Sequence, residues 1–311
     1  MVLAATTALG AAGLERAFPP RGRFVGLRGG RLHALETRAK GPSRGLVALL
    51  HGASGNGLDM MEALGDRLAQ AGFDVVAFDR PGAGHSDRFA GRGPELPASQ
   101  AAIVAEALDA MGAPPAILVG HSLAGAMTLA LALDRPDRVA AVTLVSPVTH
   151  PWPGGVDRYY DVAAHPVVGW PFTRLVTLPA GAALMTRATK GVFAPGAPPP
   201  HFARRTALPL VLRPGAFRAN AFDVTAMKAA VTAQTPRYAG LRTPLEIVTG
   251  DSDGVVWAHI HSAGCARDVP GARLTTLRGI GHSPHWSAPE SVVEAILRAA
   301  ARAQGVEGAS T

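Results

Sequence analysis

A serine set among small residues, where an apolar run meets a helix-like run, is the feature that most constrains how this chain can fold. The motif Gly120-His121-Ser122-Leu123-Ala124-Gly125 follows the β-type run 115–119 and precedes a helical pattern. Small residues allow the backbone to turn sharply there, so the serine hydroxyl points out of the sheet and helix N–H groups face it. The motif therefore predicts that Ser122 is a nucleophile at a strand-to-helix turn.

Four further segments fit the same architecture in order along the chain. Apolar strands are expected at 46–50, 73–78, 245–249 and 272–277. They lead into the loops 51–57, 79–86, 250–256 and 279–284, which carry Gly, Asp and His. With these motifs the chain resembles the serine hydrolases of the α/β-hydrolase superfamily, which use the chain order Ser, Asp, His. The resemblance implies an α/β fold, with a mostly parallel twisted sheet flanked by helices and a helical lid insertion.

The resemblance also assigns roles to three side chains. His282 is expected to take the proton of Ser122 and return it to the leaving group, while Asp253 orients the imidazole ring and stabilises its cation. Asp251 is the alternative acid, and it could instead close the turn as an Asx-type cap. Asp253 is preferred because Gly254-Val255-Val256 follows it, as in the family pattern.

Backbone N–H groups are expected to bind the oxyanion. In this family they belong to the residue after the nucleophile, here Leu123, and to a residue of the loop after the first parallel strand. Alignment to the family pattern places the second donor at Ala53, with Ser54 as the alternative one residue further on.

Neither a metal nor a cofactor is predicted. His282 and His285 form an H-x-x-H pattern, and His259 and His261 an H-x-H pattern. Both lack the helical i, i+4 spacing and the intervening glutamate of a zinc signature. The glycine-rich runs 52–57 and 82–84 match neither a dinucleotide-binding fingerprint nor a phosphate-binding loop.

The order of these signals suggests one core domain with an insertion. The predicted α/β-hydrolase core comprises residues 21–147 and 239–311, and the lid or cap comprises residues 148–238, which are rich in proline and, in their first half, aromatic residues. A lid of this kind supplies walls of an apolar pocket and excludes water. Within it, residues 221–233 have a helical pattern. Residues 1–20 form a separate N-terminal segment, expected to be frayed or membrane-associated.

The net charge, the cysteine and the N-terminal residues say less about partners and cellular location than the motifs say about activity. The net charge is +7, but the arginines are spread along the chain, so no nucleic-acid partner is predicted. The single cysteine, Cys265, excludes an internal disulfide and is expected to pack inside a helix. Residues 1–14 are uncharged and too short to span a bilayer as a helix. A cytoplasmic location is favoured, and membrane association or export through residues 1–14 is the alternative.

The predicted activity is hydrolysis of a carboxylic ester through an acyl-enzyme, acting on a small apolar acyl substrate. Hydrolysis of a carbon–carbon bond by the same three residues is the first alternative, and thioesters, lactones and amides are also open. A non-catalytic binding protein on a hydrolase scaffold is the alternative from a different functional class.

Overall fold

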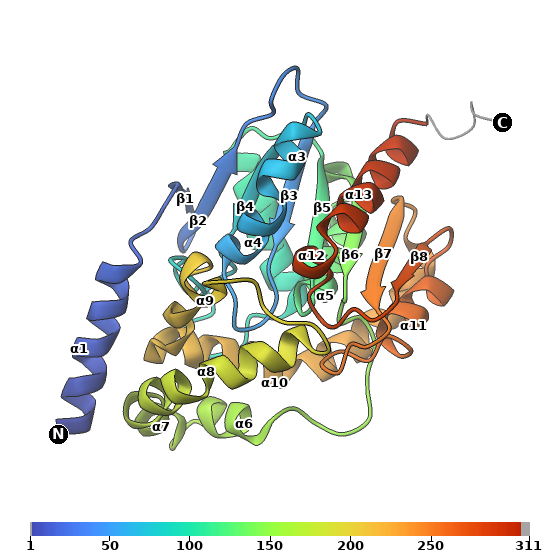
Figure 1. The fold of residues 1–311 in the computed structure, drawn as a ribbon. Helices are drawn as coiled ribbons and strands as arrows, with labels where there is room; N and C mark the ends of the chain where they lie inside the picture. The colour runs from blue at the N-terminus through green and yellow to red at the C-terminus, as the bar shows by residue number, and fades with distance from the viewer. Residues whose placement is uncertain (1, 306–311) are drawn as a thin grey trace.

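An eight-stranded sheet forms the centre of the protein (Figure 1). The computed structural model describes residues 2–305, with side chains from residue 7 onward. The sheet order is β1-β2-β4-β3-β5-β6-β7-β8. The strands are β1 (Arg23–Leu27), β2 (Gly30–Thr37), β3 (Leu46–Leu50), β4 (Asp74–Phe78), β5 (Ala116–His121), β6 (Val139–Val145), β7 (Leu245–Gly250) and β8 (Arg273–Leu277). β2 is antiparallel to its neighbours β1 and β4. All neighbouring strands from β4 to β8 in the sheet order are parallel, which confirms the predicted fold class.

Helices fill the connections between the strands. They are α1 (Val2–Ala17), α2 (Gly57–Met60), α3 (Asp66–Gln70), α4 (Pro97–Ala110), α5 (Ala124–Asp134), α6 (Arg158–Ala164), α7 (Gly169–Leu175), α8 (Thr177–Phe193), α9 (Phe202–Arg205), α10 (Pro214–Gln234), α11 (His261–Asp268), α12 (Pro284–Ser287) and α13 (Pro289–Ala303). A π turn, Met61–Gly65, joins α2 to α3, and 3-10 turns occupy Pro136–Arg138, Leu208–Leu212 and Thr235–Gly240. Among residues 2–305, no helix is both long and apolar enough to cross a membrane.

The central strands are apolar on both sides because helices cover both faces of the sheet. Neighbouring side chains of a strand point to opposite faces. Leu118 of β5 therefore packs with α4 and α5 on one face, and Val119 packs with α3 and α13 on the other. Cys265 of α11 is buried in the first of these cores, where it packs as expected.

The chain between β6 and β7 is helical and lies below the carboxyl ends of the parallel strands (Figure 1). We call residues 148–238 the cap. Its longest helix, α10, includes the predicted helix at 221–233. At the N-terminus, α1 packs against α7 and α8, and Gly10 leaves room for the Leu178 side chain. Residue 1 and residues 306–311, which the predicted N-terminal segment and core include, lie outside the described residues.

We expect Gly250→Ala to destabilise the fold. A Cβ atom at Gly250, the last residue of β7, would lie 1.9 Å from the Ile280 carbonyl oxygen. Because that neighbour is backbone, the two loops would have to move apart, at a cost of about 1–3 kcal/mol. Chemical denaturation measures the change. Gly254→Ala is the matched control, since nothing described lies within 4 Å of its Cβ position. Equal stability of the two variants would contradict the steric argument.

Candidate active site

Ser122 occupies a strained turn between β5 and α5. Its φ of 54° lies in the left-handed region, which a residue with a side chain rarely adopts. The turn is possible because small residues surround it. A Cβ at Gly120 would lie 2.2 Å from Thr128 Oγ1, and one at Gly125 would lie 2.5 Å from Pro147 Cβ. Ala124, which stands where the usual motif has glycine, is fully buried. The local sequence thus selects a turn that aims the hydroxyl out of the sheet.

Three loops bring Ser122, His282 and Asp253 into one hydrogen-bonded chain. His282 Nε2 lies 2.9 Å from Ser122 Oγ, and His282 Nδ1 lies 2.8 Å from Asp253 Oδ2. The three residues are only 4–8% exposed. With Nδ1–H donating to the carboxylate, Nε2 is the nitrogen that can accept the serine proton. This arrangement can activate a hydroxyl in a site from which water is largely excluded.

The electrostatics of Asp253 suit an ionised acid. Burial opposes its charge, but the hydrogen bond from His282 and the N–H groups of Val255 and Val256, each 2.9 Å from Oδ1, outweigh burial and lower the pKa of Asp253. Asp251 lies elsewhere. It is exposed, and its carboxylate accepts from the Ser252 hydroxyl and the Gly279 N–H, both at 2.8 Å. Asp251 therefore closes a turn, and only Asp253 contacts the histidine.

The loop that carries His282 is held from two sides. The His121 ring donates from Nε2 to the His282 carbonyl at 3.0 Å, and the His282 N–H donates to the carbonyl of Val192 in α8 at 3.2 Å. Burial is the main reason that the pKa of His121 is well below its ordinary value, so its ring is neutral and can act as this donor. The end of a cap helix thus helps to position the histidine.

The loop after β3 lies directly against Ser122. A Cβ at Gly52 would be 2.8 Å from Ser122 Cβ, so only glycine permits this approach. The N–H of Ser54 donates to Asn220 Oδ1 at 2.8 Å. Within residues 2–305, the N–H groups of Ala53 and Leu123 have no hydrogen-bond partner. Those two donors are free to bind an oxygen of a substrate, whereas that of Ser54 is occupied.

A buried arginine fixes the same loop. Arg80 follows β4, and its guanidinium donates to the carbonyls of His51 at 3.1 Å and Gly52 at 3.2 Å. Burial and the Arg80 charge lower the pKa of His51 to about 4, so the neutral ring can accept the Arg80 N–H at Nε2, 2.9 Å away. Asp223 of cap helix α10 lies 3.6 Å from Arg80, and this ion pair links the cap to the loop.

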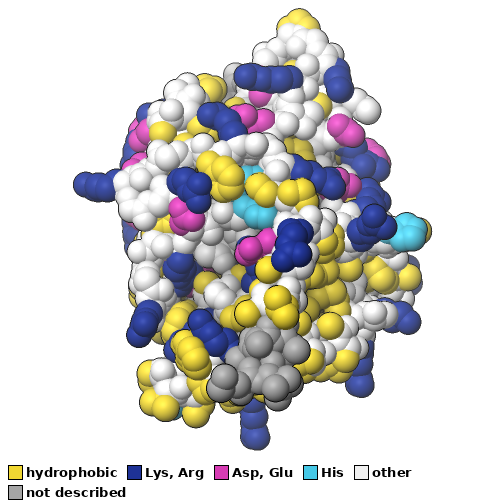
Figure 2. Space-filling model, turned by 90° about the vertical axis from the view of Figure 1, so that its left-hand side faces the viewer, with side chains coloured by type: hydrophobic (Ala, Val, Ile, Leu, Met, Phe, Trp, Pro, Cys, Tyr) yellow, Lys and Arg dark blue, Asp and Glu magenta, His cyan; other side chains and the backbone are white. Residues whose placement is uncertain are grey.

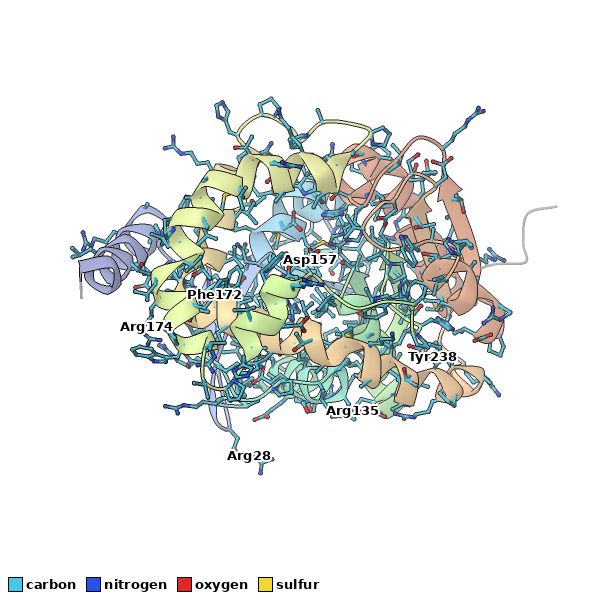
Figure 3. All side chains as sticks on the ribbon, turned by 90° about the horizontal axis from the view of Figure 1, so that it is seen from below. Arg28, Arg135, Asp157, Phe172, Arg174 and Tyr238 are labelled. Carbon is cyan, nitrogen blue, oxygen red and sulfur yellow. The ribbon has the colours of Figure 1, made fainter. Side chains whose placement is uncertain are left out.

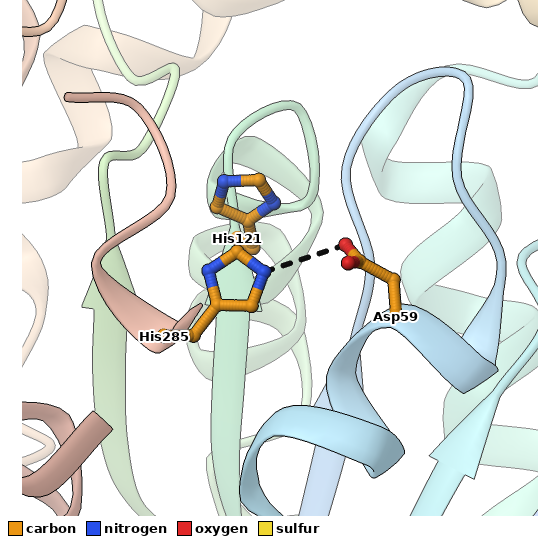
Figure 4. Close-up of side chains that lie close together, drawn as sticks. All are labelled: Asp59, His121 and His285. Carbon is orange, nitrogen blue, oxygen red and sulfur yellow. Dashed lines mark hydrogen bonds and ion pairs between the residues drawn. The ribbon is translucent and has the colours of Figure 1, made fainter. Parts of the chain in front are cut away.

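One cluster of metal-type ligands includes His121, the residue before Ser122 (Figure 4). Ligand atoms of Asp59, His121 and His285 lie within 4.8 Å of one another, and it is the single such group found among the described residues. His285 Nε2 is 3.4 Å from Asp59 Oδ2, and Trp286 Nε1 donates to Asp59 Oδ1 at 2.8 Å. Burial opposes the charge of Asp59, but His285 outweighs it and lowers the Asp59 pKa.

The histidines considered for a metal from the sequence do not assemble into that cluster, apart from His285. His259 is exposed. His261 Nδ1 instead accepts the N–H groups of Thr149 at 3.3 Å and His150 at 3.2 Å. His282 faces Ser122 and Asp253.

The comparisons with known proteins identify the family of this chain. Residues 45–289 match the family model described as the alpha/beta hydrolase fold. The chain belongs to the α/β-hydrolase fold family. It is therefore a protein of a hydrolase family.

Individual relatives differ in their reactions. RutD of Variovorax paradoxus, to which carbamate hydrolysis is attributed, is 36% identical over 117 residues, or 38% of this chain and 44% of that protein. The 2-hydroxy-6-oxononadienedioate/2-hydroxy-6-oxononatrienedioate hydrolase of Burkholderia vietnamiensis is 33% identical over 117 residues, or 37% of this chain and 39% of that protein. The chain thus matches less than half the length of either relative. The crystal structure of carboxylesterase CesB from Bacillus subtilis superposes with a TM-score of 0.69 at 18% identity, covering 96% of this chain and 98% of that one, which shows a shared fold.

Sequence reasoning missed the cap residues that reach the site. Asn220 contacts Ser54 through both its amide oxygen and its Nδ2, and Tyr160 lies with its hydroxyl 3.2 Å from Ser54 Oγ. Asp223 is one helical turn beyond Asn220. The available signal was an Asn and an Asp at i, i+3 on a helix face that is otherwise mostly apolar, because such residues are buried only where they have partners.

We expect Asp253→Asn to lower hydrolytic turnover roughly 10⁴-fold, because the amide favours the wrong imidazole tautomer. Asp251→Asn, in the same loop, should cost far less, since its carboxylate contacts no part of the hydrogen-bonded chain. Steady-state kinetics on one activated ester compares the two variants. If Asp251→Asn proves the more damaging, the acid has been assigned to the wrong aspartate.

Proposed function

We propose that the protein is a serine hydrolase that cleaves a carboxylic ester through an acyl-enzyme intermediate. The observation that carries this proposal is the buried chain of hydrogen bonds from Asp253 through His282 to Ser122. A serine hydroxyl is a weak nucleophile unless an adjacent base accepts its proton. Here the base His282, the acid Asp253 that orients it, and the strained turn that points the Ser122 hydroxyl out of the sheet occur together.

The reaction proceeds in two halves. Ser122 Oγ attacks the ester carbonyl carbon while His282 Nε2 takes the hydroxyl proton, and Asp253 stabilises the resulting imidazolium. The tetrahedral intermediate collapses, the imidazolium protonates the departing alcohol, and Ser122 remains acylated. A water molecule deprotonated by His282 then attacks the acyl carbon and releases the acid. No cofactor takes part in this scheme.

Two backbone donors stabilise the charge that develops on the carbonyl oxygen. We assign them to Leu123 and Ala53, whose N–H groups are unpartnered in the described part of the chain and border Ser122. Preorganised donors of this kind contribute about 3–4 kcal/mol each to transition-state stabilisation. Ser54 is the poorer candidate because Asn220 already occupies its N–H.

The cap closes over this chemistry and supplies apolar walls. Leu123, Val148, Met227 and Val256 form a cluster beside the nucleophile, with Trp152 packed against it. An apolar acyl or alcohol group would lie against this cluster, so the proposed substrate is a small apolar ester. Residues 148–238 act as the lid, because the site they cover is almost closed to solvent.

Entry of substrate requires part of the cap to move. Helix α10 is anchored by Asp223 and Asn220, whereas α8 buries only its two terminal residues, Thr177 and Phe193. Segments with few buried contacts open at lower free energy. We therefore assign the opening movement to α8 and the fixed wall to α10, on which α6 is packed.

Carbon–carbon bond hydrolysis is the second candidate, favoured by the local similarity to the Burkholderia vietnamiensis hydrolase. Epoxide opening is disfavoured because it requires a carboxylate nucleophile, and Ser122 stands at that position. A binding protein without activity would retain the fold but would have no use for an activated serine.

We expect Ser122→Ala to abolish turnover, on the order of 10⁶-fold as in comparable serine hydrolases, while the fold is kept. It should also abolish labelling by a fluorophosphonate probe, which reacts only with an activated serine. Circular dichroism checks the fold, and Ser54→Ala, in the adjacent loop, is the control. A variant at position 122 that keeps a tenth of the wild-type rate would overturn the nucleophile assignment. Absence of labelling in the wild type would favour the binding protein.

A panel of p-nitrophenyl esters of increasing acyl length, run beside a ring-fission diketone, separates the two enzymatic candidates. We expect measurable kcat/KM on the esters, with short to medium apolar acyl groups preferred because the cluster at Met227 and Trp152 is compact. Faster turnover of the diketone than of every ester would replace the ester assignment with carbon–carbon hydrolysis.

A further inference from the structure

The cap carries an unusual distribution of charge. From Val162 to Phe222 the sequence contains no Asp or Glu, although acids occur throughout the rest of the chain. The same stretch contains seven cationic side chains, at Arg174, Arg187, Lys190, Arg204, Arg205, Arg213 and Arg218. Helices α7 to α9 and the first half of α10 belong to it. The cap therefore presents positive charge that its own sequence does not neutralise.

Five arginines, three of them from this stretch, line a cleft between α1, α7 and α10. The cleft has a volume of about 730 Å³, and Arg88, Arg92, Arg174, Arg213 and Arg218 line it. Glu15 is its one acidic lining residue and is paired with Arg213 at 3.0 Å, while Arg88 is paired with Asp223 at 2.7 Å. Among the described residues, no carboxylate lies within 4.0 Å of the other three guanidinium groups.

Two of these three arginines are held in place by aromatic rings. The Arg174 guanidinium lies 4.2 Å from the centre of the Trp170 ring, and that of Arg218 lies 5.3 Å from the centre of the Phe222 ring. The Nε–H of Arg218 is buried and has no hydrogen-bond partner among the described atoms. A buried donor left without a partner costs free energy, which an anionic oxygen in the cleft would recover.

Exposed apolar side chains lie on the helices that form the cleft and on their neighbour α8. Val167, between α6 and α7, is 73% exposed, and Leu9, Trp170 and Leu184 are each more than half exposed. Helices α1, α7 and α8, which carry the last three, pack against one another. Figure 2 shows apolar side chains gathered at the base of this face with Lys and Arg among them, and Figure 3 shows Arg174 on the side of the cap next to α1.

We propose that this outer cap face docks on an anionic phospholipid membrane, with lipid phosphates bound in the arginine-lined cleft. Exposed apolar side chains beside unpaired cations favour a surface that offers both hydrocarbon and negative charge. Nucleic acid would satisfy the arginines but would leave Val167 and Leu184 exposed to water. The docked protein lies on the bilayer, with the cap facing the apolar phase from which small esters would enter.

Vesicle co-sedimentation of the full-length protein tests the proposal. The wild type should bind vesicles of phosphatidylcholine with phosphatidylglycerol at low salt, and binding should weaken as salt screens the charges. Arg174→Gln with Arg218→Gln should lower the binding constant roughly 30-fold, since each basic residue near an anionic surface contributes about a factor of five. Leu184→Asn should weaken binding without changing its salt dependence.

The control replaces two exposed arginines outside the cap, Arg38→Gln with Arg242→Gln, and should bind like the wild type. Thermal melting curves establish that all variants are folded. Ser122→Ala should also bind vesicles like the wild type, so the test of membrane docking is independent of the test of ester hydrolysis. Equal binding by the two double variants, or equal binding to vesicles without phosphatidylglycerol, would overturn the proposal, as would no sedimentation of the wild type.

Discussion

The close approach of backbone segments at the carboxyl edge of the sheet is the constraint on which the site depends. Gly52 lies against Ser122, and Gly250 lies against Ile280, at distances that no Cβ atom could occupy. These approaches place the loops so that two hydrogen bonds of 2.8–2.9 Å can form through His282. Because displacement by about 1 Å can cost 10²-fold in rate, steric exclusion here governs the chemistry as much as the reactive groups do.

A second constraint joins the cap to the core through buried charge. Arg80 and Asp223 are both almost fully buried, and isolated charges would be unfavourable there. Their pairing, with the Arg80 hydrogen bonds to the loop after β3, ties α10 to the same loop that offers Ala53. Removing one partner would leave an unpaired buried charge, so this contact resists opening. Helix α8 has no buried ion pair of this kind with any described residue, and its contact with the His282 loop is a backbone hydrogen bond at Val192, near its C-terminal end.

The cap thus differs on its two sides. Its inner side contributes apolar side chains such as Met227, which clusters with Leu123, and the polar contacts of Asn220 with Ser54 in the loop after β3. Its outer side contributes arginines without acidic partners and exposed apolar residues such as Val167. The inner side suits the proposed apolar ester, and the outer side suits the proposed anionic membrane. A single insertion can serve both purposes because a layer of helices has two faces with independent side chains.

The sequence by itself indicated the fold class, because the motif around Ser122 and the apolar runs with their following loops resemble the pattern of the α/β-hydrolase superfamily. The same resemblance assigned Ser122, Asp253 and His282 their expected roles. Tertiary structure decided what local patterns cannot encode. The preference for Asp253 over Asp251 as the partner of His282 depends on which carboxylate lies within reach. The occupied N–H of Ser54 depends on Asn220, which is 166 residues away. Contacts of that kind arise only when distant segments pack together, because hydrogen bonding and burial act through space and leave no periodic trace in the chain.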